Sequence, residues 1–411
     1  MIHRDGNRII FADSLYISEL TGALALLHQV VKAGYVDAIL DFGSCTAALP
    51  APVLAICSQV MKLRLSQFEF ELVLPERPDL ARHFINANWA HLLDPARNAP
   101  SRFRGFTIFP ATQFEDSAAQ KTAVDRIVDG ILGATPDLDR KGLAALEWSV
   151  NEITDNVLVH SQSPVGGLVQ MSMFHRMSRR IEYIVVDAGI GIPRTLRQSH
   201  PDLSSDTAAL ERAIREGVTR DENLGQGNGL YGSYQVCSHS KGFFHLQSGF
   251  AKLAFTSSKG LAVSAEKVPF EGALVAAQIN FSDPQLLGEA LKFGGRVHVP
   301  MDFVETHYEQ IDSNEVQFTL KTEATSFGSR LAGTPVRNKL MNLVRMCPGQ
   351  RIIVDFTDVP LVSSSFADEV LGKLFMELGP MTFAQRLEFR NLSSIVRQLT
   401  DKAIAQRMSK T

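Results

Sequence analysis

Three short polar and glycine-rich motifs constrain this chain of 411 residues more than any other feature. In chain order they are Asn151-Glu152-Ile153-Thr154-Asp155-Asn156, Asp187-Ala188-Gly189-Ile190-Gly191 and Gly225-Gln226-Gly227-Asn228-Gly229-Leu230. Each motif alone is compatible with an ordinary helix edge, turn or loop. Their occurrence together, in this order and between predicted helices and strands, indicates one binding pocket in the middle of the chain.

The first motif lies on a predicted helix that spans about residues 138–160. Glu152, Asn156 and His160 are spaced four residues apart, so they share one helix face at the edge of an apolar stripe. The side-chain oxygen of Asn156 is a suitable ligand for Mg²⁺, which bridges nucleotide phosphates. The carboxylate of Glu152, one turn earlier, could act as a catalytic base. The alternative is a helix margin that faces solvent.

The second motif begins where an apolar strand ends. Asp187 follows a run of apolar residues and precedes Gly189 and Gly191. A carboxylate can accept a hydrogen bond from the amino group of adenine, and glycines let the backbone approach the ring closely. The alternative is an ordinary tight turn with an acidic residue at its start.

The third motif matches the G-x-G-x-x-G spacing of dinucleotide-binding folds at Gly227, Gly229 and Gly232. That interpretation fails, because the motif follows a polar loop rather than a strand, and no suitable acid lies about twenty residues downstream. The segment instead predicts a glycine-rich hinge before a helix at 230–237, whose N-terminal amides would face phosphates. The alternative is a plain flexible loop.

Together the three motifs resemble the N, G1 and G2 boxes of the GHKL ATPases. This fold is shared by histidine kinases, gyrase B, the MutL proteins and the anti-sigma-factor serine kinases, and the N box is closest to the last branch. The resemblance implies that the chain binds ATP and Mg²⁺, with Asn156 at the metal, Asp187 at adenine and residues 193–229 as the ATP lid. It implies Glu152 as the general base if ATP is turned over. The other nucleotide-binding positions that it implies are Gly189, Gly191, Gly225, Gly227, Gly229 and Leu230.

Gly272-Ala273-Leu274 resembles, more weakly, a third glycine box of the same family, after G1 and G2. It has alanine where the family usually has threonine. Histidine kinases also carry a phosphoacceptor histidine on a dimerisation helix. The predicted helix at 117–132 contains no histidine, so phosphorylation of this chain on histidine is not expected.

The two ends of the chain share a strand–helix–strand pattern that predicts parallel α/β units. It spans residues 38–42, 52–63 and 70–74 near the N-terminus, and residues 350–356, 366–378 and 386–389 near the C-terminus. We therefore predict three domains, at 1–98, 103–282 and 313–411. The fold class is α/β and α+β multidomain, with a central GHKL sandwich between two smaller α/β domains.

The C-terminal pattern resembles the STAS-like domains of anti-sigma-factor antagonists, and the N-terminal pattern resembles a degenerate copy. In those antagonists a serine before the helix is phosphorylated by a GHKL kinase, and Ser364 aligns with that serine, which makes it a candidate phosphosite. The alternative is a helix cap, because Ser365 and Asp368 have the spacing of a capping box.

Composition limits the partners of the chain. A net charge of −3 and a pI near 6.4 give no general attraction to nucleic acid or to a membrane surface. No leader segment and no run of about eighteen apolar residues is present, so a cytoplasmic location is expected. Four scattered cysteines argue against a zinc site or a disulfide framework.

The sequence therefore predicts an ATP- and Mg²⁺-binding regulatory signalling protein. Its STAS-like domains would contact a partner protein or a second copy, which leaves a homodimer open. One alternative is a serine/threonine protein kinase that acts on Ser364 or on another STAS domain. A second alternative is a slow ATP-hydrolysing dimeric clamp. Whether the protein is an enzyme stays open at this point.

Overall fold

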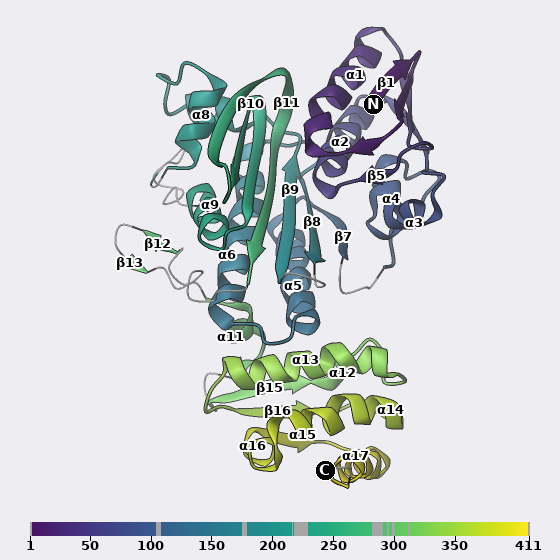
Figure 1. Cartoon of the computed structure of the whole chain (residues 1–411), viewed down its shortest axis with the longest axis vertical. Coiled ribbons are helices and arrows are strands. Elements are labelled where there is room, and N and C mark those ends of the chain that lie inside the picture. Colours follow the sequence, from purple (N-terminus) through teal and green to yellow (C-terminus); the bar gives the residue numbers. More distant parts are fainter. Residues whose placement is uncertain are drawn as a thin grey trace. The chain divides into compact units, whose positions relative to one another are not determined.

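The computed structural model describes residues 2–103, 108–174, 179–215, 217, 229–281, 291–293, 296–297, 301–310 and 313–409. The chain forms two compact units. The first contains Met1–Val124 and Trp148–His298, and the second contains Asp125–Glu147 and Val299–Thr411. Several separate sheets with helices between them confirm the predicted multidomain α/β and α+β class (Figure 1). The domain boundaries at 98, 103, 282 and 313 stay a prediction.

The N-terminal part of the first unit is a small four-stranded sheet with the order β1-β2-β4-β6. Its first pair is antiparallel and the other two pairs are parallel. The parallel strands are joined through helices, as predicted from the apolar runs at 38–42, 52–63 and 70–74. The elements are β1 (Ile2–Asp5), β2 (Arg8–Phe11), α1 (Leu20–Lys32), β4 (Asp37–Asp41), α2 (Pro50–Leu65), β6 (Glu69–Val73), α3 (Pro78–Asn86) and α4 (Trp89–Leu93).

The central part of the first unit is a five-stranded antiparallel sheet with the order β10-β11-β9-β8-β7. The strands are β7 (Ile108–Phe114), β8 (Gly167–Phe174), β9 (Arg180–Asp187), β10 (Phe243–Thr256) and β11 (Gly260–Asn280). The predicted helices in this part are confirmed as α5 (Ser117–Ala134), α6 (Arg140–Asn156) and α9 (Gly229–His239). Both α5 and α6 contribute residues to the two units.

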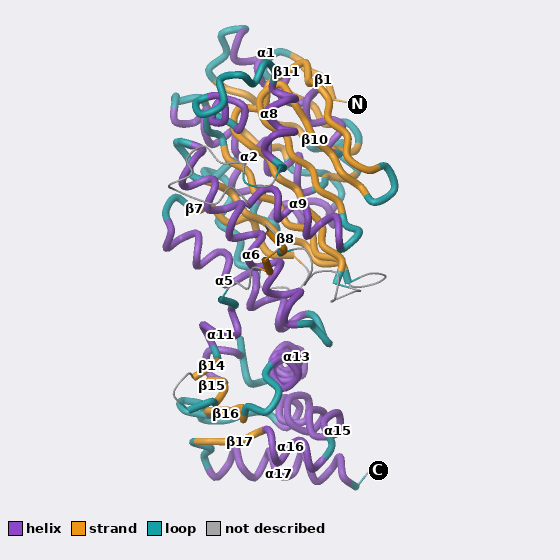
Figure 2. The backbone as a smooth tube through the Cα atoms, turned by 90° about the vertical axis from the view of Figure 1, so that its left-hand side faces the viewer, coloured by secondary structure: helices purple, strands orange, loops and turns teal. Residues whose placement is uncertain are grey.

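The two faces of the central sheet are covered differently, because successive side chains of a strand point to opposite faces. On β9, Tyr183 lies on the face of α6, where its hydroxyl forms a 2.6 Å hydrogen bond with Ser149. Its neighbours Ile184 and Val186 belong instead to one core with the N-terminal helices. Figures 1 and 2 show α2 beside β8, β9 and β11. The central sheet is therefore packed on both faces.

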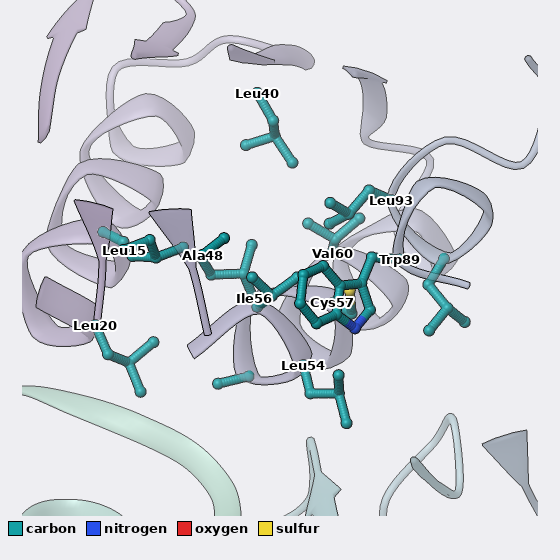
Figure 3. Close-up of a cluster of buried hydrophobic side chains, with 14 of the residues drawn as sticks. Leu15, Leu20, Leu40, Ala48, Leu54, Ile56, Cys57, Val60, Trp89 and Leu93 are labelled. Carbon is teal, nitrogen blue, oxygen red and sulfur yellow. The ribbon is translucent and has the colours of Figure 1, made fainter. Parts of the chain in front are cut away.

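That shared core contains many fully buried side chains of α2 and α4. Figure 3 shows Leu54, Ile56, Cys57 and Val60 of α2 around Trp89 of α4. Burial of a large side chain of this kind contributes about 1.5–3 kcal/mol. The N-terminal domain and the central sheet are therefore joined by a hydrophobic core.

The hairpin of β10 and β11 is longer than the sequence indicates. The sequence predicts strands at residues 242–247 and 273–281. The two strands of the structure remain paired out to the turn between Thr256 and Gly260. Most side chains of residues 260–269 are exposed or half-buried, so they lack the apolar alternation of a strand with one buried face. A register shift lies at Ser248–Ala251.

The second unit contains another four-stranded sheet, with the order β14-β15-β16-β17. Its strand directions match those of the N-terminal sheet, with one antiparallel pair followed by two parallel pairs. The prediction that both ends repeat one strand–helix–strand pattern is therefore confirmed. The elements are α11 (Phe303–His307), β14 (Glu309–Gln310), β15 (Glu315–Thr319), α12 (Leu320–Glu323), α13 (Arg330–Met346), β16 (Arg351–Asp355), α14 (Ser364–Ala367), η3 (Asp368–Gly372), α15 (Lys373–Leu378), α16 (Pro380–Arg386), β17 (Leu387–Arg390) and α17 (Ser394–Met408).

Candidate functional site

Helix α6 carries the first motif on the edge of its buried face. The predicted apolar stripe is confirmed, since its members are all buried: Leu143, Leu146, Val150, Ile153 and Val157. Glu152 and Asn156 beside the stripe are half-buried. Directly after Asn156 the helix widens into a π-helical turn, η2 (Val157–Ser161), and Gln162 ends it in the left-handed conformation. Single π-turns inside α-helices occur frequently at functional sites.

Asp187 lies at the end of β9 and is 3 % exposed. The backbone N–H of Gly189 donates a 2.8 Å hydrogen bond to its carboxylate, and the N–H of Ala273 on β11 donates another. Burial raises the pKa of the Asp187 carboxyl to about 7, while these two hydrogen bonds and the charge of Lys62 act in the opposite direction. A buried acceptor of this kind is suited to one specific donor group on a ligand.

The glycines of the second motif are required by close backbone contacts. A Cβ on Gly189 would collide with the carbonyl oxygen of Ser161, the last residue of η2. The next residue, Ile190, donates its N–H to that same oxygen at 2.8 Å. Gly191 has a φ of +80°, a backbone conformation in which a residue with a side chain would be strained. The turn after Asp187 therefore packs directly against the end of the helix that carries Asn156.

The third motif reaches the same helix at Gly229, the first residue of α9. A Cβ on Gly229 would lie 2.7 Å from a carboxylate oxygen of Glu152 and 3.5 Å from Nδ2 of Asn156. Leu230 follows as the second residue of α9 and is half-buried. Gly225 and Gly227 lie outside the described residues. The structure thus brings Glu152, Asn156 and Gly229 together, and it connects Asn156 to the Asp187 turn through η2.

The electrostatic environment of Glu152 differs from that of an ordinary surface acid. Burial, followed by the negative charge of Asp155, raises the pKa of the Glu152 carboxyl. A carboxylate whose pKa moves toward neutrality becomes a better general base than an exposed one. The neighbouring Asp155 is exposed and points away from the apolar stripe. The half-buried Glu152, and not the exposed Asp155, is therefore compatible with the catalytic base that the first motif predicts.

Two serines that hold the site together were missed by the sequence analysis. Ser161 provides the carbonyl oxygen on which the Asp187 turn rests. Ser248, fully buried on β10, donates through Oγ to the carbonyl of Gly272 at 2.5 Å and accepts the N–H of Ile192 at 2.9 Å. No sequence pattern marks Ser248, because β10 carries other polar residues such as His245 and Gln247.

The described part of the predicted lid, residues 193–229, contains two short helices. They are α7 (Ile192–Arg197) and α8 (Asp206–Ala213), and the side chain of Ser205 caps the start of α8. Arg197 and Asp206 form a 2.6 Å ion pair between them. Residues 216 and 218–228 of the predicted lid lie outside the described residues.

The candidate phosphosite, Ser364, is exposed and is the first residue of α14. The capping box predicted from Ser365 and Asp368 is wrong. The helix begins two residues earlier, because Ser363 is the cap and its Oγ accepts the N–H of Phe366 at 3.0 Å. The hydroxyl of Ser364 is therefore not needed for the helix start.

The described residues also bear on metal binding and on membrane insertion. Where the structure describes the chain, no cluster of three or more His, Cys, Asp or Glu side chains could hold a metal ion by itself. Within the same residues no helix has both the length and the apolar character needed to span a membrane.

Comparison with known families gives one match, in the second unit. Residues 332–397 match the model of a STAS-like domain of unknown function (DUF4325). This range includes most of α13, then β16, the Ser364 helix and β17, so the predicted C-terminal STAS-like domain is confirmed. No curated protein matches the chain. The match indicates a regulatory role and an interaction with other proteins for this part of the chain.

Proposed function

We propose that the central part of the first unit binds ATP with Mg²⁺ and that the bound nucleotide regulates how the STAS-like domain meets a partner protein. The observation that supports this proposal is the convergence of all three motifs on helix α6. Gly229 contacts the Glu152 and Asn156 side chains, and the Asp187 turn rests on Ser161 at the end of the same helix. The convergence of three motifs, separated by long stretches of sequence, on one helix supports a single binding site.

In this proposal each motif binds one part of the nucleotide. The ionised carboxylate of Asp187 accepts a hydrogen bond from the adenine amino group, and Gly189 and Gly191 let the backbone come close to the ring. Asn156 contributes its side-chain oxygen to Mg²⁺, which neutralises phosphate charge. The N-terminal amides of α9, an eleven-residue helix, face the phosphates. GHKL ATPases are the family whose motif order this arrangement fits.

The first experiment is calorimetry of Mg-ATP with the wild-type chain, Asn156→Ala and Asp187→Asn. Both variants should bind at least tenfold more weakly, because each loses one charge-assisted or metal-mediated contact. Asn151→Ala is the matched control, since Asn151 is also a half-buried asparagine of α6. Absence of Mg-ATP binding by the wild type would overturn the proposal, and equal binding by all three variants would place the nucleotide elsewhere.

A second candidate function, a serine/threonine protein kinase, is favoured by one pair of observations. The raised pKa of Glu152 suits a base that activates a hydroxyl group, and Ser364 exposes a hydroxyl at the start of a STAS-like helix. Incubation with radiolabelled ATP, followed by site mapping, tests it. Label on Ser364 that disappears in Glu152→Gln would establish the kinase. Release of labelled phosphate to water without protein label would leave a plain ATPase.

A further inference from the structure

Helix α2 of the N-terminal part packs against β9, the strand that ends at Asp187. This helix packs on the face of the central sheet opposite α6, where Leu54 shares a core with Val186 and Leu274. Next to that core, the indole N–H of Trp89 donates a 2.7 Å hydrogen bond to the buried side chain of Gln170 on β8. The domain therefore covers the strands that carry Asp187 and Ala273.

Two polar side chains of α2 extend beyond this core to a single residue of β11. Gln59 is 6 % exposed and donates through Nε2 to the carbonyl oxygen of Glu271 at 2.8 Å. One turn later, Nζ of Lys62 lies 2.7 Å from the Glu271 carboxylate. Both the backbone and the side chain of Glu271 are therefore held by the N-terminal domain.

Glu271 directly precedes the two residues of β11 that surround Asp187. Gly272 has a φ of +109°, and a Cβ there would collide with the carbonyl oxygen of Asp187. The N–H of Ala273 donates to the Asp187 carboxylate. The carbonyl of Gly272 accepts from Ser248, which also receives the N–H of Ile192. A shift of the Glu271 backbone would therefore displace hydrogen-bond partners both of Asp187 and of the turn that follows it.

We propose that Gln59 and Lys62 are positioning residues for nucleotide recognition: by holding Glu271 they fix Gly272 and Ala273 against Asp187. Neither side chain contacts the nucleotide in this arrangement. The N-terminal domain is then part of the adenine site and not a separate attachment. This inference rests on the proposed ATP-binding function and deepens it.

The test is calorimetry of Mg-ATP with Gln59→Ala, Lys62→Met and Glu271→Gln. Loss of one hydrogen bond or ion pair behind the pocket should weaken ATP binding by about fivefold to tenfold. Thr21→Val is the matched control. Thr21 of the same domain donates a 2.6 Å hydrogen bond to Glu266, five residues earlier on β11 and away from Asp187. This control should change ATP affinity by less than about twofold.

Selectivity separates positioning from a general loss of fold. ITP carries a carbonyl oxygen in place of the adenine amino group, so it lacks the donor at position 6 that Asp187 would accept from. The three variants should lose affinity for ATP and keep their affinity for ITP, which lowers the ratio between the two affinities. A domain that merely unfolded would lose both nucleotides together, and thermal unfolding of each variant checks this directly.

The pH profile gives a second readout. Among the described residues, the charged group that acts on the Asp187 carboxyl is Lys62 on α2, and its positive charge lowers the Asp187 pKa. Lys62→Met should therefore move the pH midpoint of ATP binding upward. Gln59→Ala should move it in the same direction, because it loosens the Ala273 N–H that also lowers the Asp187 pKa.

The outcomes are distinguishable. Wild-type binding of ATP together with unchanged affinity, selectivity and pH midpoint in all three variants would overturn the positioning role and leave the proposed function intact. Failure of the wild type to bind ATP would overturn both. Loss of ATP selectivity in the α2 variants, with the Thr21→Val control unaffected, is the result expected from the structure.

Discussion

At the scale of single residues, the site depends on a carboxylate that the fold places in an apolar environment. Asp187 is buried at the end of β9, and only two backbone N–H groups and the more distant Lys62 favour its charged form. Burial is the larger effect, so its pKa lies near 7 and not near the usual value of 3.8. The free protein therefore destabilises the ionised carboxylate that a donor group of a ligand would stabilise.

This has a measurable effect on stability. Because the folded pKa is raised, the stabilisation is fully present below the unfolded pKa and is lost as the pH rises through about 7. Asp187→Asn should therefore unfold at higher denaturant concentration than the wild type at pH 8, by a few kcal/mol on the order-of-magnitude scale of such shifts. At pH 4 the two proteins should unfold alike. The exposed Asp155→Asn is the control, and a difference between wild type and Asp187→Asn that does not vary with pH would refute this explanation.

A pair of glycine substitutions tests the close contact between the Asp187 turn and helix α6. Gly189→Ala should lower the free energy of unfolding by more than about 1 kcal/mol, because its Cβ meets the carbonyl of Ser161. Gly22→Ala on α1 has nothing within 4 Å of the added Cβ. It should raise stability by about 0.5–1 kcal/mol through helix propensity. Equal effects in urea titrations would show that the turn moves freely.

At the scale of elements, the second unit holds the hairpin between α5 and α6 by buried polar groups. The guanidinium of Arg140, the first residue of α6, forms ion pairs with Asp302 at 2.6 Å and Glu309 at 2.8 Å. On α13, Asn342 donates to the carbonyls of Leu132 and Thr135 at 2.9 and 2.8 Å. These bonds satisfy the carbonyls at the end of α5, which otherwise lack partners within the helix.

Lys339 of α13 is the most buried cation of this group. Its ammonium lies 2.5 Å from Asp129 and 2.6 Å from Glu323, and its side chain is 6 % exposed. Lys339→Met should lower the free energy of unfolding of the second unit by about 3 kcal/mol, because a buried carboxylate loses its cation. The exposed Lys402→Met on α17 is the control. Equal denaturation midpoints for the two variants would contradict this account.

The sequence predicts some elements better than others. The reason is the separation along the chain of the residues whose interactions specify them. Helix α6 and strands β9 and β16 are predicted because their own apolar periodicity specifies them. The meeting of the three motifs also follows from their resemblance to a known order. Contact between Gln59 and Glu271 has no signal in the sequence, because these residues are 212 positions apart and neither belongs to a motif. The long outer half of β11 was missed because its exposed side chains follow no period.

At the scale of the whole chain, one sheet topology occurs twice. In the N-terminal domain the helix between the third and fourth strands is α2, which begins with Pro50 and is buried against the central sheet. In the STAS-like domain the corresponding helix begins with the exposed Ser364. The N-terminal sheet thus packs the helix between its last two strands against the central sheet, whereas the corresponding helix of the C-terminal sheet begins with an exposed hydroxyl group.

If the N-terminal domain and the central sheet form one cooperative unit, they should unfold together. The chain has two tryptophans, Trp89 in the N-terminal domain and Trp148 on α6, so Trp89→Phe and Trp148→Phe each leave one local probe. Each variant is unfolded with urea and followed by fluorescence and by circular dichroism. The fluorescence midpoint of each variant should coincide with the circular-dichroism midpoint of the first unit. A Trp89 signal that changes well before the Trp148 signal would show that α2 detaches independently.

The tether between the N-terminal domain and the sheet has a consequence for competition. Only the stretch between Leu93 of α4 and Ile108 of β7 separates the two parts along the chain. A domain on a short linker reaches its own docking face at an effective concentration on the order of millimolar. A free protein of equal affinity, present at micromolar concentration, would therefore hold that face in about one molecule in a thousand. A free domain of the same fold would therefore compete poorly for that face of the sheet.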